Sequence, residues 1–339
     1  MTADLQSDPN APIHVLVTGG AGFIGSHTAE LLLARGCRVT VIDNLSSGYR
    51  SNLAGCEGRD AFQFIEGDVT QDVGEMCARA AKRFGPIGRI VHFAAQTAVP
   101  LSVEDPVTDI HINLGGLARL LEFARRNGVQ KVVFASSSAV YDDDAPVPVS
   151  EASTARPASP YGIDKLAGEF FLDYYARYHG VAFTALRFMN VYGPRQDPLS
   201  YYSGVISIFM DRAVTGQPIT IFDDGEQTRD FVYVTDVAQA VATAALSAAG
   251  NGAVINIGTG IEVSINQITR TILDLTGSAS PVRHEPPRIG DIRRSVTTMT
   301  RARELLNFSP RVDLREGLAN TLAWVREQAL LHARRGSAA

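Results

Sequence analysis

The stretch Ile13-His-Val-Leu-Val-Thr-Gly-Gly-Ala-Gly-Phe-Ile-Gly25 decides the fold of this 339-residue chain. It opens with a short apolar run that stops at Thr18-Gly19-Gly20, as a buried parallel strand does. Residues 26–35, which follow, have the apolar spacing of a helix, and Gly36 ends it. The stretch therefore predicts a strand, a glycine-rich turn and a helix in direct succession.

The glycines of this turn indicate a dinucleotide site. Their spacing is GxxGxxG rather than GxGxxG. Gly19 and Gly22 permit a tight turn and a close approach of the backbone to a pyrophosphate, whose charge sits at the helix N-terminus. Gly25 permits close packing of the helix on the strand. A plain strand–helix turn also uses glycine, so the flanking strand and helix carry the inference.

Strands and helices alternate along the first half of the chain. Further strands are expected at 39–42, 62–65, 90–93, 132–135 and 182–186, with helices at 114–127 and 161–178. This alternation predicts an α/β fold with a Rossmann-type, doubly wound parallel sheet. We expect the nucleotide-binding Rossmann domain at 12–188 and a smaller α/β substrate-binding domain at 189–332, with later segments returning to the first domain.

Composition limits the classes of function. A net charge of −5 without a long basic run argues against nucleic acid or an anionic membrane as partner. No apolar stretch reaches the ~20 residues that cross a bilayer. The polar segment 1–12 lacks the parts of a signal peptide, so a cytoplasmic protein is expected. The three Cys form no close pair and the seven His no HxxxH pair, so no metal site is predicted.

Asp43 ends the second expected strand and favours NAD over NADP. A carboxylate there accepts hydrogen bonds from both adenosine ribose hydroxyls and repels a 2′-phosphate. The alternative interpretation is a simple turn residue at a strand end. Asp68-Val69 and Phe93-Ala94-Ala95 follow the next two strands, at the carboxyl ends where such sheets bind ligands.

Tyr161 and Lys165 stand four residues apart at the start of a helix, so both project from one face. The run Ser136-Ser137-Ser138 follows the fifth strand, at the carboxyl ends of the strands where Tyr161 and Lys165 are also expected. A tyrosine base must be ionised near neutral pH although its reference pKa is about 10, which requires roughly 4 kcal/mol of preference for the anion. A positive charge about 4 Å away supplies about that much at an effective dielectric near 20, and Lys165 and an oxidised nicotinamide are two such charges. Alternatively, Tyr161 is one more helix aromatic beside a solvated lysine.

Three motifs, TGGAGFIGSH at 18–27, SSSAVY at 136–141 and SPYGIDK at 159–165, resemble those of the extended short-chain dehydrogenase/reductase family. Within it the chain is similar to the UDP-glucose/UDP-N-acetylglucosamine 4-epimerases over 13–324. The resemblance implies Tyr161 as catalytic base and acid, Lys165 as its electrostatic partner and ribose ligand, and Ser137 as hydroxyl helper. It also implies transient oxidation of the sugar at carbon 4 by bound NAD, rotation of the keto sugar, and return of the hydride to its opposite face.

The predicted site residues fall into two sets. The cofactor set comprises Gly19, Gly22, Phe23, Ile24, Gly25, Asp43, Asn44, Asp68, Val69, Phe93, Ala94, Ala95, Asn113, Tyr161, Lys165 and Phe188. The substrate set comprises Val99, Ser137, Ser138, Asn190, Gly204, Val205, Arg229, Arg288, Asp291 and Ser295.

The resemblance implies roles for the substrate set. In GEQTRDFV at 225–232, Arg229 clamps the diphosphate, and in RIGD at 288–291, Arg288 contacts phosphate and Asp291 the ribose. Gly204-Val205 lies under the uracil, while Val99 and Asn113 face the sugar. Ser295 stands where strict UDP-galactose epimerases carry Tyr, and its small size leaves room for an N-acetyl group. For each Arg, a surface ion pair is the alternative.

Two positions discriminate among members of the family. Dehydratases carry Thr-Asp-Glu before VYG, whereas this chain has Ser137-Ser138-Ala139. Without a carboxylate there, elimination of water is disfavoured, and so is decarboxylation. Asn190 in RFMNVYGP indicates a neutral hexose or hexosamine, because the uronate 4-epimerases carry Thr there. A UDP-glucuronate 4-epimerase, or another nucleotide-sugar-modifying member, is the runner-up.

Other questions stay open at the level of sequence. Relatives dimerise through two helices per subunit, here 107–126 and 161–178, so the resemblance implies a homodimer. The acidic loop Asp142-Asp143-Asp144 replaces the family's usual Gly and is either solvated or functional. A non-catalytic NAD-sensing scaffold and a reductase that releases NADH are the competing classes of function.

Overall fold

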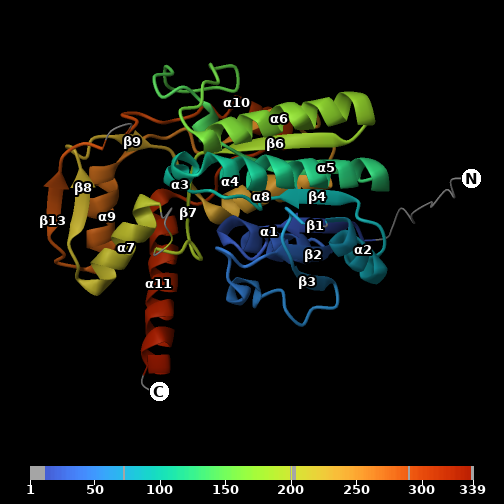
Figure 1. The fold of residues 1–339 in the computed structure, drawn as a ribbon. Coiled ribbons are helices and arrows are strands. Elements are labelled where there is room, and N and C mark those ends of the chain that lie inside the picture. The colour runs from blue at the N-terminus through green and yellow to red at the C-terminus, as the bar shows by residue number, and fades with distance from the viewer. Residues whose placement is uncertain (1–11, 72, 199, 201–203, 289–290, 337–339) are drawn as a thin grey trace, which may run out of the picture.

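The structure is a computed structural model that describes residues 12–71, 73–198, 200, 204–288 and 291–336 (Figure 1). The polar segment 1–12 lies, except for its last residue, outside the described residues. Among the described residues, no helix combines the length and apolar character needed to cross a bilayer.

A seven-stranded parallel sheet forms the larger part of the molecule (Figure 1), which confirms the predicted Rossmann-type fold. The strand order is β11-β6-β5-β4-β1-β2-β3. The strands are β1 (His14–Thr18), β2 (Arg38–Asp43), β3 (Phe62–Glu66), β4 (Arg89–His92), β5 (Lys131–Ser137), β6 (Ala182–Phe188) and β11 (Ala253–Ile257). The order reverses between β1 and β4, and in such sheets the crevice for a ligand opens at that point, beyond the carboxyl ends of the strands.

Helices cover both faces of the sheet. One face carries α1 (Phe23–Ala34), α8 (Val234–Leu246) and α10 (Thr300–Leu306), and the other carries α2 (Val73–Phe84), α5 (Gly116–Asn127) and α6 (Pro160–His179). Because side chains alternate along a strand, Val15 and Val17 of β1 pack with the first group of helices, and Leu16 with the second. The two hydrophobic cores are thus separated by the sheet.

Short elements connect the larger ones. The 3₁₀ helix Arg50–Leu53 lies between β2 and β3, and the 3₁₀ helix Ser138–Val140 between β5 and α6. The helices α3 (Val99–Glu104) and α4 (Pro106–Ile110) and the π-helical turn His111–Gly115 precede α5. The turn runs directly from α4 into α5, so residues 106–127 form one nearly continuous helix. It lies beside α6 on the outer face of the sheet (Figure 1).

A smaller lobe stands at the carboxyl-terminal side of the sheet, at the left of Figure 1. Its core packs α7 (Val205–Thr215), α9 (Ile265–Thr276) and α11 (Leu314–Gly336) with β8 (Ile219–Phe222), and the exposed strand β13 (Val282–Glu285) pairs in parallel with β8. Two further pairs are β7 (Asn190–Tyr192) with β10 (Phe231–Tyr233), and β9 (Thr228–Arg229) with β12 (Val263–Ser264).

Several segments beyond residue 188 return to the first sheet. β11 extends the sheet beside β6, and α8 packs against α1. The helix α11 continues to Gly336. The first part of α11 packs on the small lobe through Leu318, Leu322 and Val325. Tertiary packing of this kind stabilises a helix.

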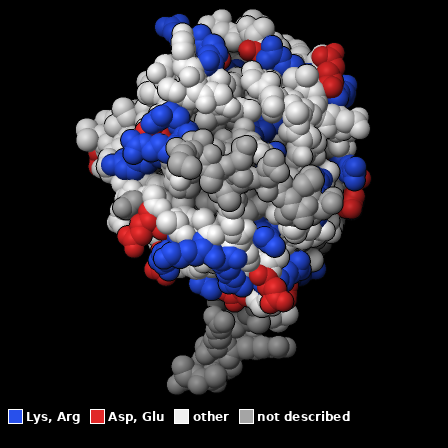
Figure 2. All heavy atoms as spheres, turned by 90° about the vertical axis from the view of Figure 1, so that its right-hand side faces the viewer, with Lys and Arg blue, Asp and Glu red and all other residues white. Residues whose placement is uncertain are grey.

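Basic and acidic side chains are interspersed on the face that Figure 2 displays. The described Lys and Arg side chains lie in several separate groups, with Asp and Glu beside them. No single sign of charge covers this face.

A buried ion pair joins α6 to two neighbouring strands. The carboxylate of Glu169 on α6 accepts two hydrogen bonds from Arg187 on β6, at 2.9 and 2.7 Å, and one from the Ser136 hydroxyl on β5, at 2.6 Å. Both charged side chains are about 5% exposed. Removing one partner of such a pair strands the other charge in a low-dielectric environment.

We expect Glu169→Ala to lower the free energy of unfolding by about 3–5 kcal/mol, because Arg187 keeps its buried charge without a counter-ion. Thermal or denaturant unfolding measures the change. The matched control is Glu57→Ala, which removes the partner of Arg50 in an ion pair with side chains about half exposed. Equal losses of unfolding free energy in the two variants would contradict the larger contribution expected of the buried pair.

Candidate active site

A cavity of about 1680 Å³ extends from the carboxyl ends of the sheet strands to the smaller lobe. Its wall includes the glycine turn and the ends of β2 to β6 on one side, and α7, β8 and the segment around Arg288 on the other. Sites for one small molecule typically measure roughly 300–1,000 Å³. The cavity therefore has room for two ligands of nucleotide size placed end to end.

Close backbone packing shapes the glycine turn. Gly19 has φ +68°, and a Cβ on it would lie 2.6 Å from the backbone nitrogen of Ala94. A Cβ on Gly25 would lie 2.2 Å from the Gly19 carbonyl oxygen. Gly22 is the N-cap of α1 and has no side chain to cap the first amides of the helix. These amides are left for an anion in the cavity.

The carboxylates at the ends of β2 and β3 hold the loops beside this turn. Asp43 accepts hydrogen bonds from the backbone amides of Ala21, at 2.9 Å, and Leu45, at 2.8 Å. Burial raises the pKa of Asp43, and these two hydrogen bonds oppose the rise. Asn44 donates to Asp68 at 2.8 Å. All three polar side chains belong to residues that line the cavity.

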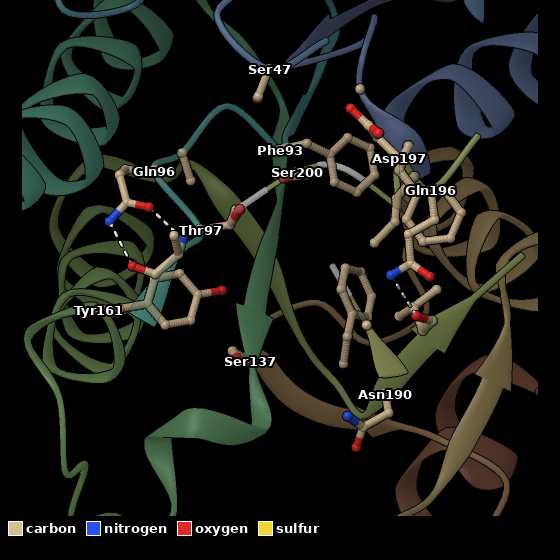
Figure 3. Close-up of a pocket in the computed structure, with 18 of the residues that line it drawn as sticks. Ser47, Phe93, Gln96, Thr97, Ser137, Tyr161, Asn190, Gln196, Asp197 and Ser200 are labelled. Carbon is tan, nitrogen blue, oxygen red and sulfur yellow. Dashed lines mark hydrogen bonds between the residues drawn. The ribbon is translucent and has the colours of Figure 1, made fainter. Parts of the chain in front are cut away.

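Tyr161 and Lys165 reach the cavity from the first turns of α6. Ser159 caps the helix by accepting a hydrogen bond from the Gly162 amide, at 3.2 Å, and Pro160 fills its first position. Figure 3 shows the Tyr161 hydroxyl directed toward β5, the strand that carries Ser137. The Lys165 ammonium lies 5.5 Å from the centre of the Tyr161 ring.

The Lys165 ammonium is enclosed by the protein. Its Nζ donates to the Ala135 carbonyl oxygen at 2.9 Å and lies 5.0 Å from the centre of the Phe134 ring. Burial lowers the pKa of Lys165 to about 8, while the negative charges of Asp109 and Asp164 act in the opposite direction.

The three serines at the end of β5 have different surroundings. Ser136 is buried and donates its hydroxyl to Glu169. The Ser137 oxygen accepts the Ala139 amide at 3.1 Å, which leaves its hydroxyl proton available to a ligand. Ser137 and Ser138 both belong to the cavity wall.

Polar residues line the far end of the cavity. Arg229 donates to the Ile292 carbonyl oxygen at 2.6 Å and forms an ion pair with Asp291. The Arg288 guanidinium stacks over the Phe222 ring at 3.8 Å. Asn190 begins β7 below the cavity centre in Figure 3, and Gly204 is the N-cap of α7. The cavity wall includes Asn190, Gly204, Val205, Phe222, Arg229, Arg288 and Asp291.

Three predicted residues are not part of the cavity wall: Val99, Asn113 and Ser295. Asn113 lies in the π-helical turn behind the wall. Its Oδ1 accepts the Gln96 amide at 2.9 Å, and its Nδ2 donates to the Gln96 carbonyl oxygen at 3.2 Å. Ser295 is tied to the chain beside Arg229, since its amide donates to the Thr228 carbonyl oxygen at 3.2 Å. The remaining predicted residues all line the cavity.

Sequence reasoning missed contacts that join the loop at 193–197 to the other side of the cavity. Tyr49 donates to Asp197 at 2.5 Å, and Arg195 pairs with Glu30 of α1 at 2.7 Å. A third contact joins the His27 ring to the Pro194 carbonyl oxygen at 3.0 Å. These partners are more than 140 positions apart, so no local pattern signals them.

The described residues contain no group of three or more His, Cys, Asp or Glu side chains arranged to hold a metal ion. The polar groups of the cavity are instead backbone amides, hydroxyls, carboxylates and guanidinium groups. They suit phosphates, ribose hydroxyls and a sugar.

Comparisons with known proteins agree with this geometry. The model of the NAD dependent epimerase/dehydratase family matches residues 15–258. The UDP-glucose 4-epimerase of Mycolicibacterium smegmatis is 41% identical over 319 residues, which cover 94% of this chain and 100% of the relative.

Solved structures give the same relationship. The UDP-glucose 4-epimerase of Thermotoga maritima, solved with UDP-glucose, has a TM-score of 0.87 and 39% identity, covering 94% of this chain and 100% of its own. That of Thermus thermophilus, solved with NAD, has a TM-score of 0.82 and 40% identity, covering 93% and 99%. The chain therefore belongs to the NAD-dependent epimerase/dehydratase family of extended short-chain dehydrogenases/reductases, and it is an enzyme that uses NAD.

Proposed function

We propose that this enzyme interconverts the carbon-4 epimers of UDP-hexoses, UDP-glucose and UDP-galactose, and also those of their N-acetylamino counterparts. One observation carries the proposal. Tyr161 and Lys165 share a single cavity with the glycine turn and, at its far end, with Arg229 and Arg288. A reactive phenol thus lies between a place for a dinucleotide and a place for a second diphosphate.

The residues of the first half of the cavity fit NAD. The Gly19 backbone comes so near to Ala94 that a side chain on Gly19 is excluded, and the amides at the N-terminus of α1 have no capping side chain. Asp43 gives the ribose end of the site a carboxylate with lone pairs beyond those used by Ala21 and Leu45. When bound, NAD supplies a reversible acceptor for the hydrogen on carbon 4 of the sugar.

Tyr161 supplies the proton transfers. Its phenolate takes the proton of the sugar 4-hydroxyl as carbon 4 is oxidised, and returns it after the keto sugar has turned over. The Lys165 ammonium stabilises the phenolate electrostatically. The Ser137 hydroxyl donates a hydrogen bond to the reacting oxygen. Because the proton that leaves is the proton that returns, these groups end each turnover in their starting state.

Arg229 and Arg288 are assigned to the diphosphate, at the end of the cavity away from Tyr161. Guanidinium groups bind phosphate oxygens through paired donors. Arg229 now pairs with Asp291. We assign Asp291 to the ribose hydroxyls, so in the complex the phosphate takes over part of the contacts of Arg229. An anchor placed here leaves the hexose free to present either face to the nicotinamide.

The wall near Tyr161 favours a neutral sugar. Asn190 contributes an uncharged amide, and Ser138 and Ala139 provide no carboxylate for elimination of water. Ser295 is small and not part of the wall, so it does not obstruct an N-acetyl group. UDP-glucuronate is the runner-up substrate. An NAD-binding scaffold is less well supported, because the proton-transfer residues are all in place. A reductase would use the same residues, and cofactor that stays bound through purification would count against it.

We expect purified enzyme to convert UDP-glucose to UDP-galactose and UDP-N-acetylglucosamine to its galacto epimer, and to leave UDP-glucuronate largely unchanged. Tyr161→Phe should lower turnover by at least roughly 10²-fold, because it removes the acid–base group. Chromatography of the product sugars measures both effects. Nucleotide-sugar binding by calorimetry serves as the control and should be retained by the variant. Conversion of UDP-glucuronate alone establishes the runner-up, and full turnover by the variant rejects the mechanism.

Asp43→Asn should lower the affinity for NADH and reduce the preference for NADH over NADPH, by roughly ten- to a hundredfold. The substitution removes the charge that binds the ribose hydroxyls and repels a 2′-phosphate. Titration of the two dinucleotides by fluorescence measures the ratio, and the melting temperature controls for loss of structure. An equal loss of affinity for both dinucleotides contradicts the role given to Asp43.

We also propose that two copies of the enzyme associate through α4, α5 and α6. The helix α5 continues the α4 helix beside α6. Large apolar side chains are exposed on α4 and α6: Val107, Ile110, Ile163, Phe170, Phe171, Tyr174 and Tyr178. Val107 is 75% exposed and Phe170 is 68% exposed. Contiguous apolar surface of this kind marks an interface between proteins. The helix formed by α4 and α5 together, and α6, make a pair in each copy. Two such pairs form a four-helix bundle.

Phe170→Glu should convert a dimer to a monomer, since it places a charge in the apolar contact. Size-exclusion chromatography with light scattering measures the mass. The control is Ile261→Glu, at another exposed apolar side chain outside these helices. A wild-type enzyme that is monomeric at micromolar concentration rejects the dimer.

A further inference from the structure

Two carboxyl groups are buried together behind the wall of the active site. Asp109 on α4 is 1% exposed and Asp164 on α6, next to Lys165, is 4% exposed. The side chains contact each other. Neither residue lines the cavity, so neither is placed to touch a substrate. The burial of two acids in contact with each other requires a physical explanation, because a buried ionised carboxylate without partners is costly.

Hydrogen-bond donors account for only part of this pair. Asp109 Oδ1 accepts from the Gln96 side chain at 2.7 Å and from the Asn113 side chain at 3.1 Å. Asp109 Oδ2 and Asp164 Oδ2 are both buried and receive no hydrogen bond from the described residues. Two acceptor oxygens without a donor, on side chains in contact, are satisfied together when one proton lies between them. Like charges so close cannot both be ionised easily.

The neighbouring charges identify what this pair acts on. Lys165 is the charged neighbour of both carboxyls, and both raise its pKa against the effect of burial. Gln96 and Asn113 are neutral. His92 on β4 is uncharged near neutral pH, because burial lowers its pKa to about 3. Glu169, one turn further along α6, is neutralised by Arg187.

We propose that Asp109 and Asp164 share one proton and serve as positioning residues for the reaction, supplying a single buried negative charge that keeps the Lys165 ammonium charged beside Tyr161. The inference rests on the proposed function. The carboxyl–carboxylate form carries one negative charge, against one positive charge on Lys165. The same pair, through Gln96 and Asn113, also holds the segment 93–98, which lines the cavity and includes Ala94 and Ala95.

The direction of titration supports this assignment. Burial, and next the charge of Asp109, raise the pKa of Asp164 to about 7, and burial also raises the pKa of Asp109. In a coupled pair these steps belong to the two groups jointly. Below about pH 7 the pair therefore holds a proton that two separate carboxyls in the unfolded chain have lost above about pH 4. Two variants separate this charge from the shape of the site.

Asp164→Asn mimics the protonated member and keeps one negative charge. The double variant Asp109→Asn/Asp164→Asn keeps the shape and removes the charge. In the pH profile of kcat/KM, the single variant should retain the wild-type midpoint of the acid limb. The double variant should move that midpoint up by roughly one to two pH units, because a less charged Lys165 leaves the Tyr161 pKa higher. Raising the pH should restore the turnover of the double variant, which loss of structure would not allow.

Stability gives a readout that does not need turnover. An acid whose folded pKa is raised stabilises the folded state fully below its unfolded pKa of about 4, and this stability is lost as the pH rises through the folded pKa of about 7. The melting temperature of Asp164→Asn, measured relative to wild type, should therefore rise between about pH 4 and pH 7. A difference independent of pH rejects the shared proton even if the double variant fails to fold.

The two readouts also distinguish the sources of failure. If the enzyme epimerises no UDP-sugar but the pH-dependent melting difference is present, the proposed function fails and the shared proton stands. If the enzyme is active and the double variant shows the same acid limb as wild type, the charge of the pair does not act on Lys165. Equal displacement of the acid limb in the single and double variants also overturns the proposal, because the single variant keeps the charge.

Discussion

The buried charge of Lys165 is the constraint on which the active site depends. A cation enclosed by protein loses its hydration, which shifts its equilibrium toward the neutral amine. The structure opposes this with a carbonyl oxygen, that of Ala135, with the ring of Phe134, and with the carboxyl pair of Asp109 and Asp164. These partners come from β5, α4 and α6. Groups from three separate elements thus act on the charge of one ammonium.

Much of the fold and the chemical centre could be predicted because their signals are local. A strand, a glycine turn and a helix follow one another without interruption, and Tyr161 and Lys165 lie one helical turn apart. β11 is not among the expected strands, because its place beside β6 depends on pairing with residues about 70 positions earlier. Asp109 and Asp164 carry no local signal either. Their meeting depends on the contact between α4 and α6, which no spacing in the sequence encodes.

The placement of Asn113 illustrates the limit of reasoning by resemblance. A position in a motif identifies a residue, but the direction of its side chain depends on the backbone around it. Here the π-helical turn His111–Gly115 interrupts the run of α4 into α5, and Asn113 hydrogen-bonds to both backbone groups of Gln96. The residue therefore acts on the cavity wall from behind. Ser295 and Val99 likewise need the backbone before their relation to the cavity can be judged.

The cavity is composite, and its two sides are joined by polar contacts at the surface. Tyr49 and Asp197 connect the loop after β2 to the loop before α7, while Arg195 reaches Glu30 on α1. Such partly exposed contacts contribute little stability one by one. Their location matters more, because they join the glycine-turn side of the cavity to the segment that leads into the smaller lobe.

A single site that epimerises must accept both configurations at carbon 4, and this requirement decides where binding energy can be used. Hydrogen bonds that fix one orientation of the hexose would slow its rotation, and they would be lost on the opposite epimer. Strong contacts are therefore more useful at the diphosphate, to which we assign Arg229 and Arg288, and weak, adaptable ones around the sugar. A pocket that holds the sugar loosely discriminates by room and charge rather than by paired hydroxyls. On this reasoning, the substrate range that we propose depends on the uncharged Asn190 and on the absence of a bulky side chain at Ser295 more than on any contact to the sugar's hydroxyl groups.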